Sequence, residues 1–244
     1  QRMALERAHM VLCVSRDTRA RALTHCDLMP ERAVVSNNTV DSRFTPGDRL
    51  AARQKFGLDS EFVLLTVGRL DPRERYKGHD SIIAELAGLT HPKGRPVIYL
   101  IAGDGGDRAR LEAEAEAAGV SERVRFLGQV SAADLPDLYR AADLFALPST
   151  GEGFGIVFLE AMASGTPALG LNVAGARDAL ADGILGIAAE PEGLGETLAR
   201  VIAADERDDQ ALAGCVNARY GRQAFVSHVA TLFDRDLSLS ALCQ

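Results

Sequence analysis

The chain has 244 residues with a net charge of −7, and 47% of its residues are hydrophobic. This length suffices for one large or two small globular domains. The acidic balance disfavours a general nucleic-acid binder, and no apolar run reaches the roughly 18 residues of a membrane-spanning helix. The four cysteines have neither zinc-ligand spacing nor the pattern of a disulfide framework, which is typical of a protein in a reducing cytoplasm.

The first 46 residues carry few structural elements. Ala8–Ser15 predicts a strand, Arg16–Thr24 a helix, and Arg32–Asp41 a strand that leads into a turn. Pro46-Gly47 is typical of a linker. Because the first residue is Gln1 and not Met, we expect a fragment or a processed chain.

From residue 61 onward, apolar β-branched runs alternate with helical patterns. The predicted strands are Phe62–Val67, Val97–Ala102, Val124–Leu127, Leu144–Leu147, Thr166–Leu169 and Ile184–Ile187. The predicted helices are Asp80–Gly88, Arg108–Ala118, Ala132–Ala141, Ile156–Ser164 and Ala176–Ala181. This alternation predicts an α/β fold with a doubly wound, Rossmann-like parallel sheet. Ligands of such sheets bind beyond the carboxyl ends of the strands.

The C-terminal part, Glu192–Leu239, is helical in pattern, and Gly221 indicates a break between two helices. Its last apolar residues recur at helical spacing, so we expect them to face a core. These residues are Phe225, Val229, Leu232 and Phe233.

Four cations fall within nine residues after the first strand of the predicted sheet, namely Arg69, Arg73, Arg75 and Lys77. In an acidic chain this concentration suggests an anionic ligand, since arginine grips phosphate oxygens with a planar fork and lysine supplies a mobile point charge. The alternative is a solvated, charged loop. We favour the loop for Arg73 and Arg75, and the ligand for Arg69 and Lys77.

A glycine turn between two carboxylates follows the predicted strand at Leu144–Leu147. It reads Glu152-Gly-Phe-Gly-Ile-Val-Phe-Leu-Glu160. A strand, a turn and then a helix present free backbone N–H groups and the positive end of a helix dipole, which suits a phosphate. Gly153 and Gly155 let the backbone approach a ligand closely or adopt positive φ; a simple turn is the alternative.

Glu160 lies early in this predicted helix among apolar neighbours. A carboxylate there can accept two hydrogen bonds from a vicinal diol such as a ribose. The alternative is a helix-surface glutamate, but burial in an apolar run would be costly without partners. For Glu152 the alternative is an ordinary loop carboxylate.

Together these motifs resemble the retaining glycosyltransferases of the GT-B fold, the "group 1" family. Glu152 to Glu160 resembles the family's E-x7-E signature, including the Gly-Phe-Gly turn. Val67-Gly-Arg-Leu70 with Tyr76-Lys-Gly78 is similar to its diphosphate clamp, and Ile101-Ala-Gly-Asp-Gly105 to its next strand-end loop. Val124-Arg-Phe-Leu-Gly-Gln-Val130 is similar to the segment along the nucleotide base. The motifs keep the family's order from about residue 34 to the C-terminus.

The resemblance implies a role for individual residues. Glu152 would lie near the transferred sugar as the catalytic candidate, and the other candidates would bind the nucleotide sugar. They are Arg69, Lys77, Gly128, Val130, Gly153, Phe154, Gly155, Ile156, Val157 and Glu160. No cofactor and no metal ion are expected. Ala174-Gly-Ala-Arg-Asp178 departs from the family's usual Gly-Gly-x-Pro-Glu, which puts contacts there in doubt.

The resemblance also implies a domain arrangement. Residues 1–46 would be the remnant of an N-terminal lobe plus the interdomain linker, 47–220 the C-terminal donor-binding domain of the GT-B fold, and 221–244 a C-terminal helix. The expected function is the donor-binding part of a retaining glycosyltransferase that moves a sugar to a hydroxyl acceptor. The alternative is a nucleotide-sugar-binding module or subunit without transfer activity.

The implied partners are a nucleotide sugar, the missing N-terminal lobe and an acceptor glycan or lipid; nucleic acid is not expected. The implied location is the cytoplasm, with peripheral attachment to the inner face of the membrane through the missing lobe as an open alternative.

Overall fold

The structure is a computed structural model that describes residues 2–242, with side chains as far as residue 234. Its strands are β1 (Val11–Cys13), β2 (Ala33–Val35), β3 (Phe62–Val67), β4 (Val97–Ala102), β5 (Val124–Gly128), β6 (Leu144–Leu147), β7 (Ala168–Leu171) and β8 (Ile187–Ala189). Its first helices are α1 (Arg2–Arg7), α2 (Arg16–His25), α3 (Arg49–Lys55), α4 (His79–Leu86), α5 (Arg108–Ala117) and α6 (Leu135–Ala141). The later ones are α7 (Ile156–Ala163), α8 (Ala176–Ala179), α9 (Leu194–Ala204), α10 (Asp209–Tyr220) and α11 (Arg222–Leu242).

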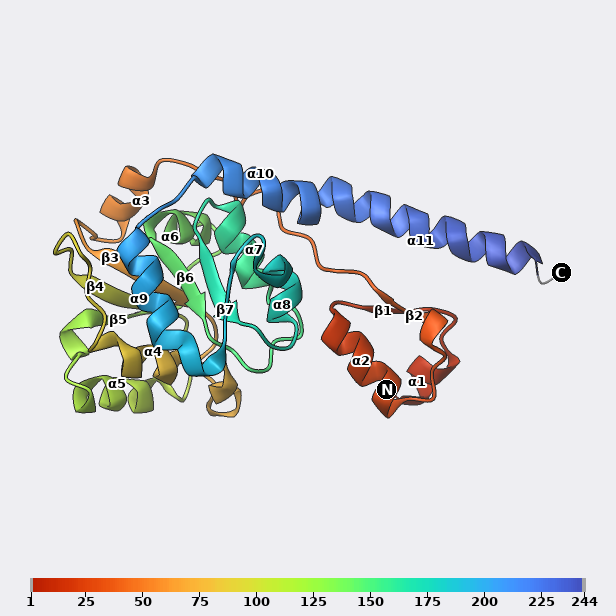
Figure 1. The fold of residues 1–244 in the computed structure, drawn as a ribbon, viewed down its shortest axis with the longest axis horizontal. Coiled ribbons are helices and arrows are strands. Elements are labelled where there is room, and N and C mark those ends of the chain that lie inside the picture. Colours follow the sequence, from red (N-terminus) through yellow and green to blue (C-terminus); the bar gives the residue numbers. More distant parts are fainter. Residues whose placement is uncertain (1, 243–244) are drawn as a thin grey trace.

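The main domain is a six-stranded parallel sheet in the order β5-β4-β3-β6-β7-β8, with helices on both faces (Figure 1). Alternate residues of β3 serve opposite faces, as pleating requires. Val63 and Leu65 pack beneath α3, α6, α7 and α10, whereas Phe62 and Leu64 pack beneath α4, α5 and α9. The predicted doubly wound α/β fold is therefore confirmed.

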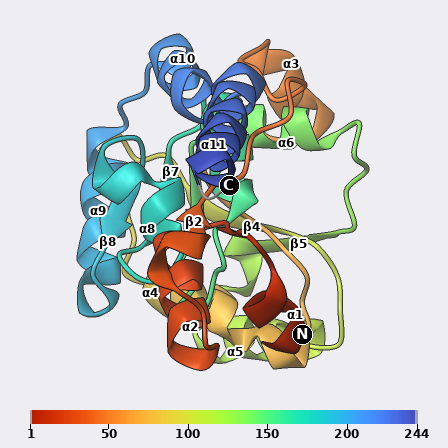
Figure 2. The same ribbon diagram turned by 90° about the vertical axis from the view of Figure 1, so that its right-hand side faces the viewer.

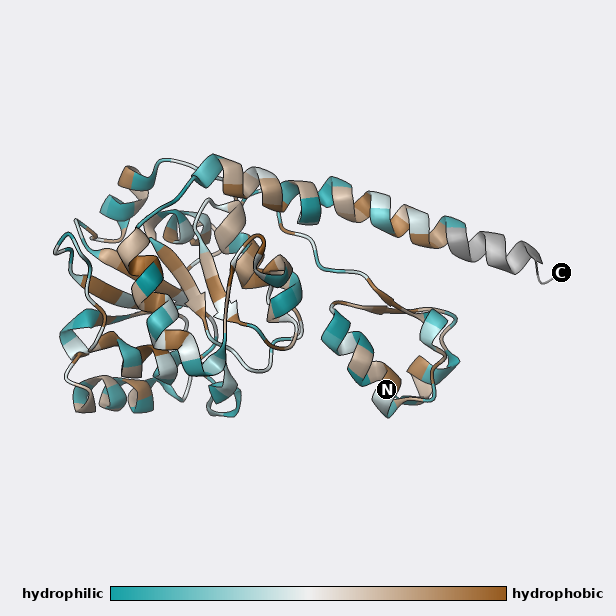
Figure 3. Cartoon of the chain, in the orientation of Figure 1, coloured by the Kyte–Doolittle hydropathy of each residue, from teal (hydrophilic) through white to brown (hydrophobic). Residues whose placement is uncertain are grey.

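The colouring by hydropathy shows why this sheet forms (Figure 3). Its central strands are mainly apolar, and all six residues of β4 are buried, as are all four of β6. Strands covered by helices on both faces have this composition. The helices are polar on the outside, which completes a three-layer arrangement.

Several predicted strands coincide with the observed ones residue for residue, namely Phe62–Val67, Val97–Ala102 and Leu144–Leu147. The predicted starts at Thr166 and Ile184 were wrong. Pro167 has no N–H to donate to a sheet, and β7 begins after it. Ile184 follows a 3-10 turn and is 78% exposed, and β8 begins three residues later.

The N-terminal residues form a small separate unit. The parallel pair β1–β2, with α1 and α2, encloses a core cluster of its own around Val11, Cys13, Leu28 and Ala33. The predicted strand Ala8–Ser15 is shorter than expected because Ser15 caps α2, its hydroxyl accepting from the Thr18 N–H at 3.0 Å.

The predicted break at Gly221 separates α10 from α11, as expected. The prediction that the apolar residues of the last helix face a core was wrong in part. Leu232 is 8% exposed, but Phe233 is 60% exposed. The reason is that α11 leaves the sheet domain and runs out on the side of the N-terminal unit (Figure 1); Figure 2 shows it nearly end-on.

Candidate functional site

The order of the strands creates a switch point between β3 and β6, where doubly wound sheets form a ligand crevice. The chain winds from β3 outward through β4 to β5, then returns to the other side of β3 and continues through β6 to β8. Ligands of doubly wound sheets bind at such a switch point, outside the carboxyl ends of the strands. Lys77 follows β3 and Glu152 follows β6, and the Lys77 Nζ lies 3.4 Å from the Glu152 Oε1.

The loop that carries Lys77 is pressed against the end of β6. The Thr150 N–H donates to the Tyr76 carbonyl at 2.9 Å. Gly78 has a φ of +73°, and a Cβ there would lie 2.6 Å from the Pro148 carbonyl oxygen. Only glycine combines this conformation with this close approach. The two strand ends therefore hold Lys77 in place, and its side chain is 14% exposed.

Arg69 and Lys77 share a carboxylate that the sequence analysis did not identify. The Arg69 guanidinium pairs with Glu74, and the Lys77 Nζ lies 3.9 Å from the second oxygen of the same carboxylate. Both candidate phosphate-binding cations thus converge on one anion. The structure brings them together despite their separation of eight positions in the sequence.

Arg73 and Arg75 have other partners. Arg73 forms an ion pair with Asp71 at 2.8 Å, and Arg75 with Asp107 at 3.2 Å. Both arginine side chains are more than half exposed. This is the solvated loop that we favoured for these two residues.

The glycine turn before α7 exposes the start of that helix. Gly155 is its N-cap with a φ of +88°, and no side chain caps it. Helix geometry leaves the first N–H groups, including those of Ile156 and Val157, without acceptors inside the helix. Ile156 is 41% exposed, so this end faces outward beside Glu152. Such an end attracts phosphate.

Not every residue of the turn points into the crevice. Phe154 is 3% exposed and makes an edge contact with the Tyr220 ring, with 5.9 Å between centroids. Val157 packs against the core. Gly153 is exposed, with open space around it. Phe154 and Val157 therefore anchor the turn by their side chains, and only their backbone can reach a ligand.

Glu160 lies half-buried in α7, where the Tyr139 hydroxyl donates a 2.8 Å hydrogen bond to its Oε2. Burial raises the pKa of the Glu160 carboxyl, and the Tyr139 hydrogen bond and the charge of Arg43 oppose that rise. Arg43 belongs to the segment that connects the N-terminal unit to the sheet. A buried carboxylate with a hydrogen-bond partner on one oxygen can accept hydrogen bonds from a diol on the other.

Gly128 and Val130 lie at the far edge of the sheet. Gly128 ends β5, and its carbonyl accepts from the Gly103 N–H at 2.8 Å. The Val130 side chain packs against the core. Because β4 separates β5 from β3, Gly128 is about 10 Å from the clamp at ordinary strand spacing. That separation suits a nucleoside diphosphate with its base near Gly128 and its diphosphate at the clamp.

Sequence reasoning missed Tyr139 and Glu74. Tyr139 is 21 residues from Glu160, and Glu74 sits in a charged loop. No local pattern marks either one, because the Tyr139 contact depends on helix packing and the Glu74 contacts depend on a kink in the loop. His79 is a further neighbour of the clamp. Burial lowers the pKa of His79 to about 4, with a smaller contribution from Lys77, so it is neutral at pH 7.

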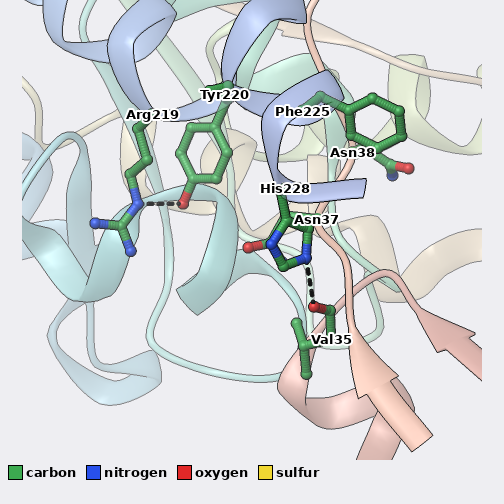
Figure 4. A pocket seen from close by; sticks show the side chains of 8 residues that line it. Val35, Asn37, Asn38, Arg219, Tyr220, Phe225 and His228 are labelled. Atoms are coloured by element: carbon green, nitrogen blue, oxygen red, sulfur yellow. Dashed lines mark hydrogen bonds between the residues drawn. The ribbon is translucent and has the colours of Figure 1, made fainter. Parts of the chain in front are cut away.

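A cavity of about 200 Å³ lies between the linker and helices α10 and α11 (Figure 4). Asn37, Asn38 and His228 line it, and the His228 Nε2 lies 3.2 Å from the Val35 carbonyl oxygen. None of its lining residues is a candidate from the sequence.

Two broader features concern only the described part of the chain. No group of three or more His, Cys, Asp or Glu residues gathers there as a metal site. No helix in it has the length and apolar character needed to cross a membrane.

The fold and the crevice place this chain in the class of doubly wound domains that bind ligands at the switch point of the sheet. Comparison with known proteins identifies the family within that class. The chain belongs to the family "glycosyl transferases group 1", which matches residues 48–221.

Among curated relatives, the D-inositol 3-phosphate glycosyltransferase of Mycobacterium sp. (strain KMS) is 38% identical over 198 residues, which is 74% of this chain and 43% of that protein. The chain thus spans about two fifths of the length of such relatives.

Solved structures with the same fold include Anabaena Alr3699/HepE in complex with UDP and glucose, with a TM-score of 0.79 and 26% identity over 96% of this chain and 65% of that one. Sucrose-phosphate synthase from Thermosynechococcus elongatus has a TM-score of 0.79 and 24% identity over 98% of this chain and 61% of that one, a likeness of fold alone.

Proposed function

We propose that this chain is the donor-binding part of a retaining glycosyltransferase, which transfers a sugar from a nucleotide-diphosphate sugar to a hydroxyl acceptor. The observation that carries the proposal is the meeting of Lys77 and Glu152 at the switch point, 3.4 Å apart. The uncapped start of α7 opens beside them. Cations, free N–H groups and a helix dipole at one place suit a diphosphate.

Each candidate then has a role along the ligand. Arg69, Lys77 and the N–H groups at the start of α7 hold the diphosphate. Glu160 accepts hydrogen bonds from the ribose, and the backbone at Gly128 and Val130 lies along the base. The similar Anabaena structure is a complex with UDP and glucose, which supports uridine as the first base to test.

The same groups assist the reaction. When the bond between the anomeric carbon and the diphosphate oxygen breaks, the electron pair stays on the diphosphate. Arg69, Lys77 and the helix dipole stabilise that developing charge, so the proposal needs no metal ion or cofactor. The acceptor hydroxyl forms the new bond to the anomeric carbon on the same face of the sugar, which retains the configuration, and its proton passes to the departing diphosphate oxygen. We assign contact with the transferred sugar to Glu152, which lies beside Lys77.

Transfer itself requires more than this chain. Because the chain spans 43% of its first relative, we propose that an N-terminal lobe supplies the acceptor site for a glycan or lipid and any peripheral contact with the cytoplasmic face of a membrane. The 244-residue chain then binds nucleotide but transfers no sugar, and turnover by this chain would contradict that. If the protein with its N-terminal lobe also lacks turnover, the alternative of a nucleotide-sugar-binding module applies.

The test of the site is a calorimetric titration of UDP into the chain and two variants. Lys77→Ala and Glu160→Ala each remove a charge-assisted hydrogen bond, which costs roughly 1.5–3 kcal/mol, or about 10- to 150-fold in Kd. Lys93→Ala is the matched control, because Lys93 is 74% exposed and pairs with Asp205 away from the crevice. Unchanged affinity in both site variants, or an equal loss in the control, would contradict the assignment.

A further inference from the structure

Glu74 lies where the proposed site would place an anion. Its carboxylate pairs through Oε1 with Arg69, and its Oε2 lies 3.9 Å from the Lys77 Nζ. The loop around it is exposed, yet the Glu74 side chain is only 15% exposed. A carboxylate of this chain therefore occupies the space between the two cations assigned to the diphosphate.

The backbone turns Glu74 inward. The 3-10 helix η2 (Pro72–Lys77) is interrupted at Glu74, whose φ of −111° and ψ of 26° are not helical. The kink separates Glu74 from its neighbours Arg73 and Arg75, which pair with Asp71 and Asp107 instead. The inward position is thus a local feature of this loop and not a general collapse of its charges.

Glu74 is poorly satisfied in this position. Its Oε2 is buried and has no hydrogen-bond partner among the described residues. A carboxylate can accept about four hydrogen bonds, and an unsatisfied buried oxygen costs free energy. Lys77 does not depend on Glu74 for its place, because Glu152 lies closer to its Nζ, at 3.4 Å against 3.9 Å.

We propose that Glu74 is an internal competitor for the diphosphate: it neutralises Arg69 and Lys77 in the empty site and is expelled when the donor binds. The inference rests on the proposed function, because it names what the donor must displace. A diphosphate carries more charge and more oxygens than one carboxylate, so it can take both cations. Glu74 thereby sets the donor affinity and keeps the clamp from holding weaker anions.

The alternative is that Glu74 supports the clamp and strengthens donor binding. If Glu74 held Arg69 in position while the donor was bound, its loss would weaken binding. The exposure of the arginine favours competition, since 76% of the Arg69 side chain is accessible and it can swing to a ligand without Glu74. The two roles predict opposite signs for one substitution.

The experiment is a calorimetric titration of UDP and of UMP into the 244-residue chain and into Glu74→Gln, at low and at high salt. Glutamine keeps the shape and removes the charge. We expect UDP to bind about two- to fivefold more tightly to the variant, the scale of a partly exposed ion pair. The gain is smaller for UMP, which lacks the second phosphate. The affinity of the variant also falls more steeply with salt, because its two cations are no longer neutralised.

Asp71→Asn is the matched control, because it removes one carboxylate from the same loop while Asp71 pairs with Arg73 outside the clamp. Thermal unfolding verifies that each variant is folded, and Glu74→Ala repeats the test. Equal or weaker UDP binding by the Glu74 variants would overturn the inference, as would an equal gain in Asp71→Asn. Failure of the unsubstituted chain to bind any nucleoside diphosphate would instead overturn the proposed function, and the inference with it.

Discussion

At the scale of one residue, Glu160 combines a charged carboxylate with burial, and the two conflict. The helix buries it among apolar neighbours, and burial raises the pKa of its carboxyl group. Tyr139 donates a hydrogen bond to its Oε2, which offsets part of that cost. A carboxylate held in an apolar setting binds a diol more strongly than one in water, because its hydrogen bonds meet less competition from solvent. We therefore interpret Glu160 as a residue kept for binding at a cost in stability.

This interpretation predicts how stability depends on pH. Because the folded pKa of Glu160 lies above its ordinary value of 4.5, the folded state holds the proton longer. The free energy of unfolding that depends on Glu160 therefore falls as pH rises from about 4.5 through the raised pKa. Glu160→Gln removes this loss, while its amide oxygen can still accept from Tyr139.

The measurement is urea unfolding of the nucleotide-free chain and of Glu160→Gln at pH 5 and pH 8. We expect the variant to gain stability relative to the unsubstituted chain at the higher pH. The same variant should bind UDP more weakly. A relative loss of stability at pH 8 would show that ionised Glu160 stabilises the fold.

At the scale of elements, sequence patterns predicted the strands that are buried on both faces. β3, β4 and β6 are almost wholly apolar runs between clear turn residues, and their ends agree residue for residue. The starts of β7 and β8 were wrong, because a proline and a 3-10 turn delay them. Local patterns do not encode where along its length a strand finds a partner.

Local patterns also predicted only a part of the candidate site. Lys77 was predicted from a cluster of cations and a resemblance to the family's clamp, and Glu152 from the resemblance of its turn to the E-x7-E signature; the parallel sheet brings the two together. Tyr139 and Glu74 were not predicted, because each acts through a contact that only the packed helices or a kinked loop create. The burial of Phe154 was also not evident, since its partner Tyr220 is 66 residues away in the sequence.

The start of α7 gives a prediction for one element. Gly155 has positive φ, and a Cβ there would lie 2.6 Å from the Phe158 ring. Gly155→Ala should lower the free energy of unfolding by about 1–3 kcal/mol, because a side chain is strained in this conformation, and it should weaken UDP binding by tilting the first turn.

Gly153→Ala is the control in the same turn. Nothing lies within 4 Å of a Cβ at Gly153, so its effect on stability should stay within about 0.5 kcal/mol. Urea unfolding and calorimetry of both variants provide the test. Equal effects of the two substitutions would contradict the expectation that the positive φ of Gly155 makes it the more sensitive position.

At the scale of the whole molecule, polar contacts join the N-terminal unit and the linker to the sheet domain. Arg16 at the start of α2 donates to Asp178 in α8 through its backbone N–H at 3.0 Å and its Nε at 2.8 Å. The linker adds a hydrogen bond from the Val40 N–H to the Tyr220 carbonyl at 3.1 Å. The proposed site lies almost entirely within the sheet domain, so nucleotide binding should not require anything beyond this chain.

A thermal-shift comparison of the 244-residue chain with UDP, GDP, ADP, dTDP and CDP tests this claim most directly. A ligand at 100 times its Kd stabilises the folded state by about 2.7 kcal/mol, and each kcal/mol raises the Tm of a domain of this size by about 2–4 °C. We predict that one nucleoside diphosphate, with UDP the first candidate, raises the Tm by about 5–10 °C while the others raise it less. A flat response to all five at millimolar concentration would contradict the proposal that this chain carries the donor site.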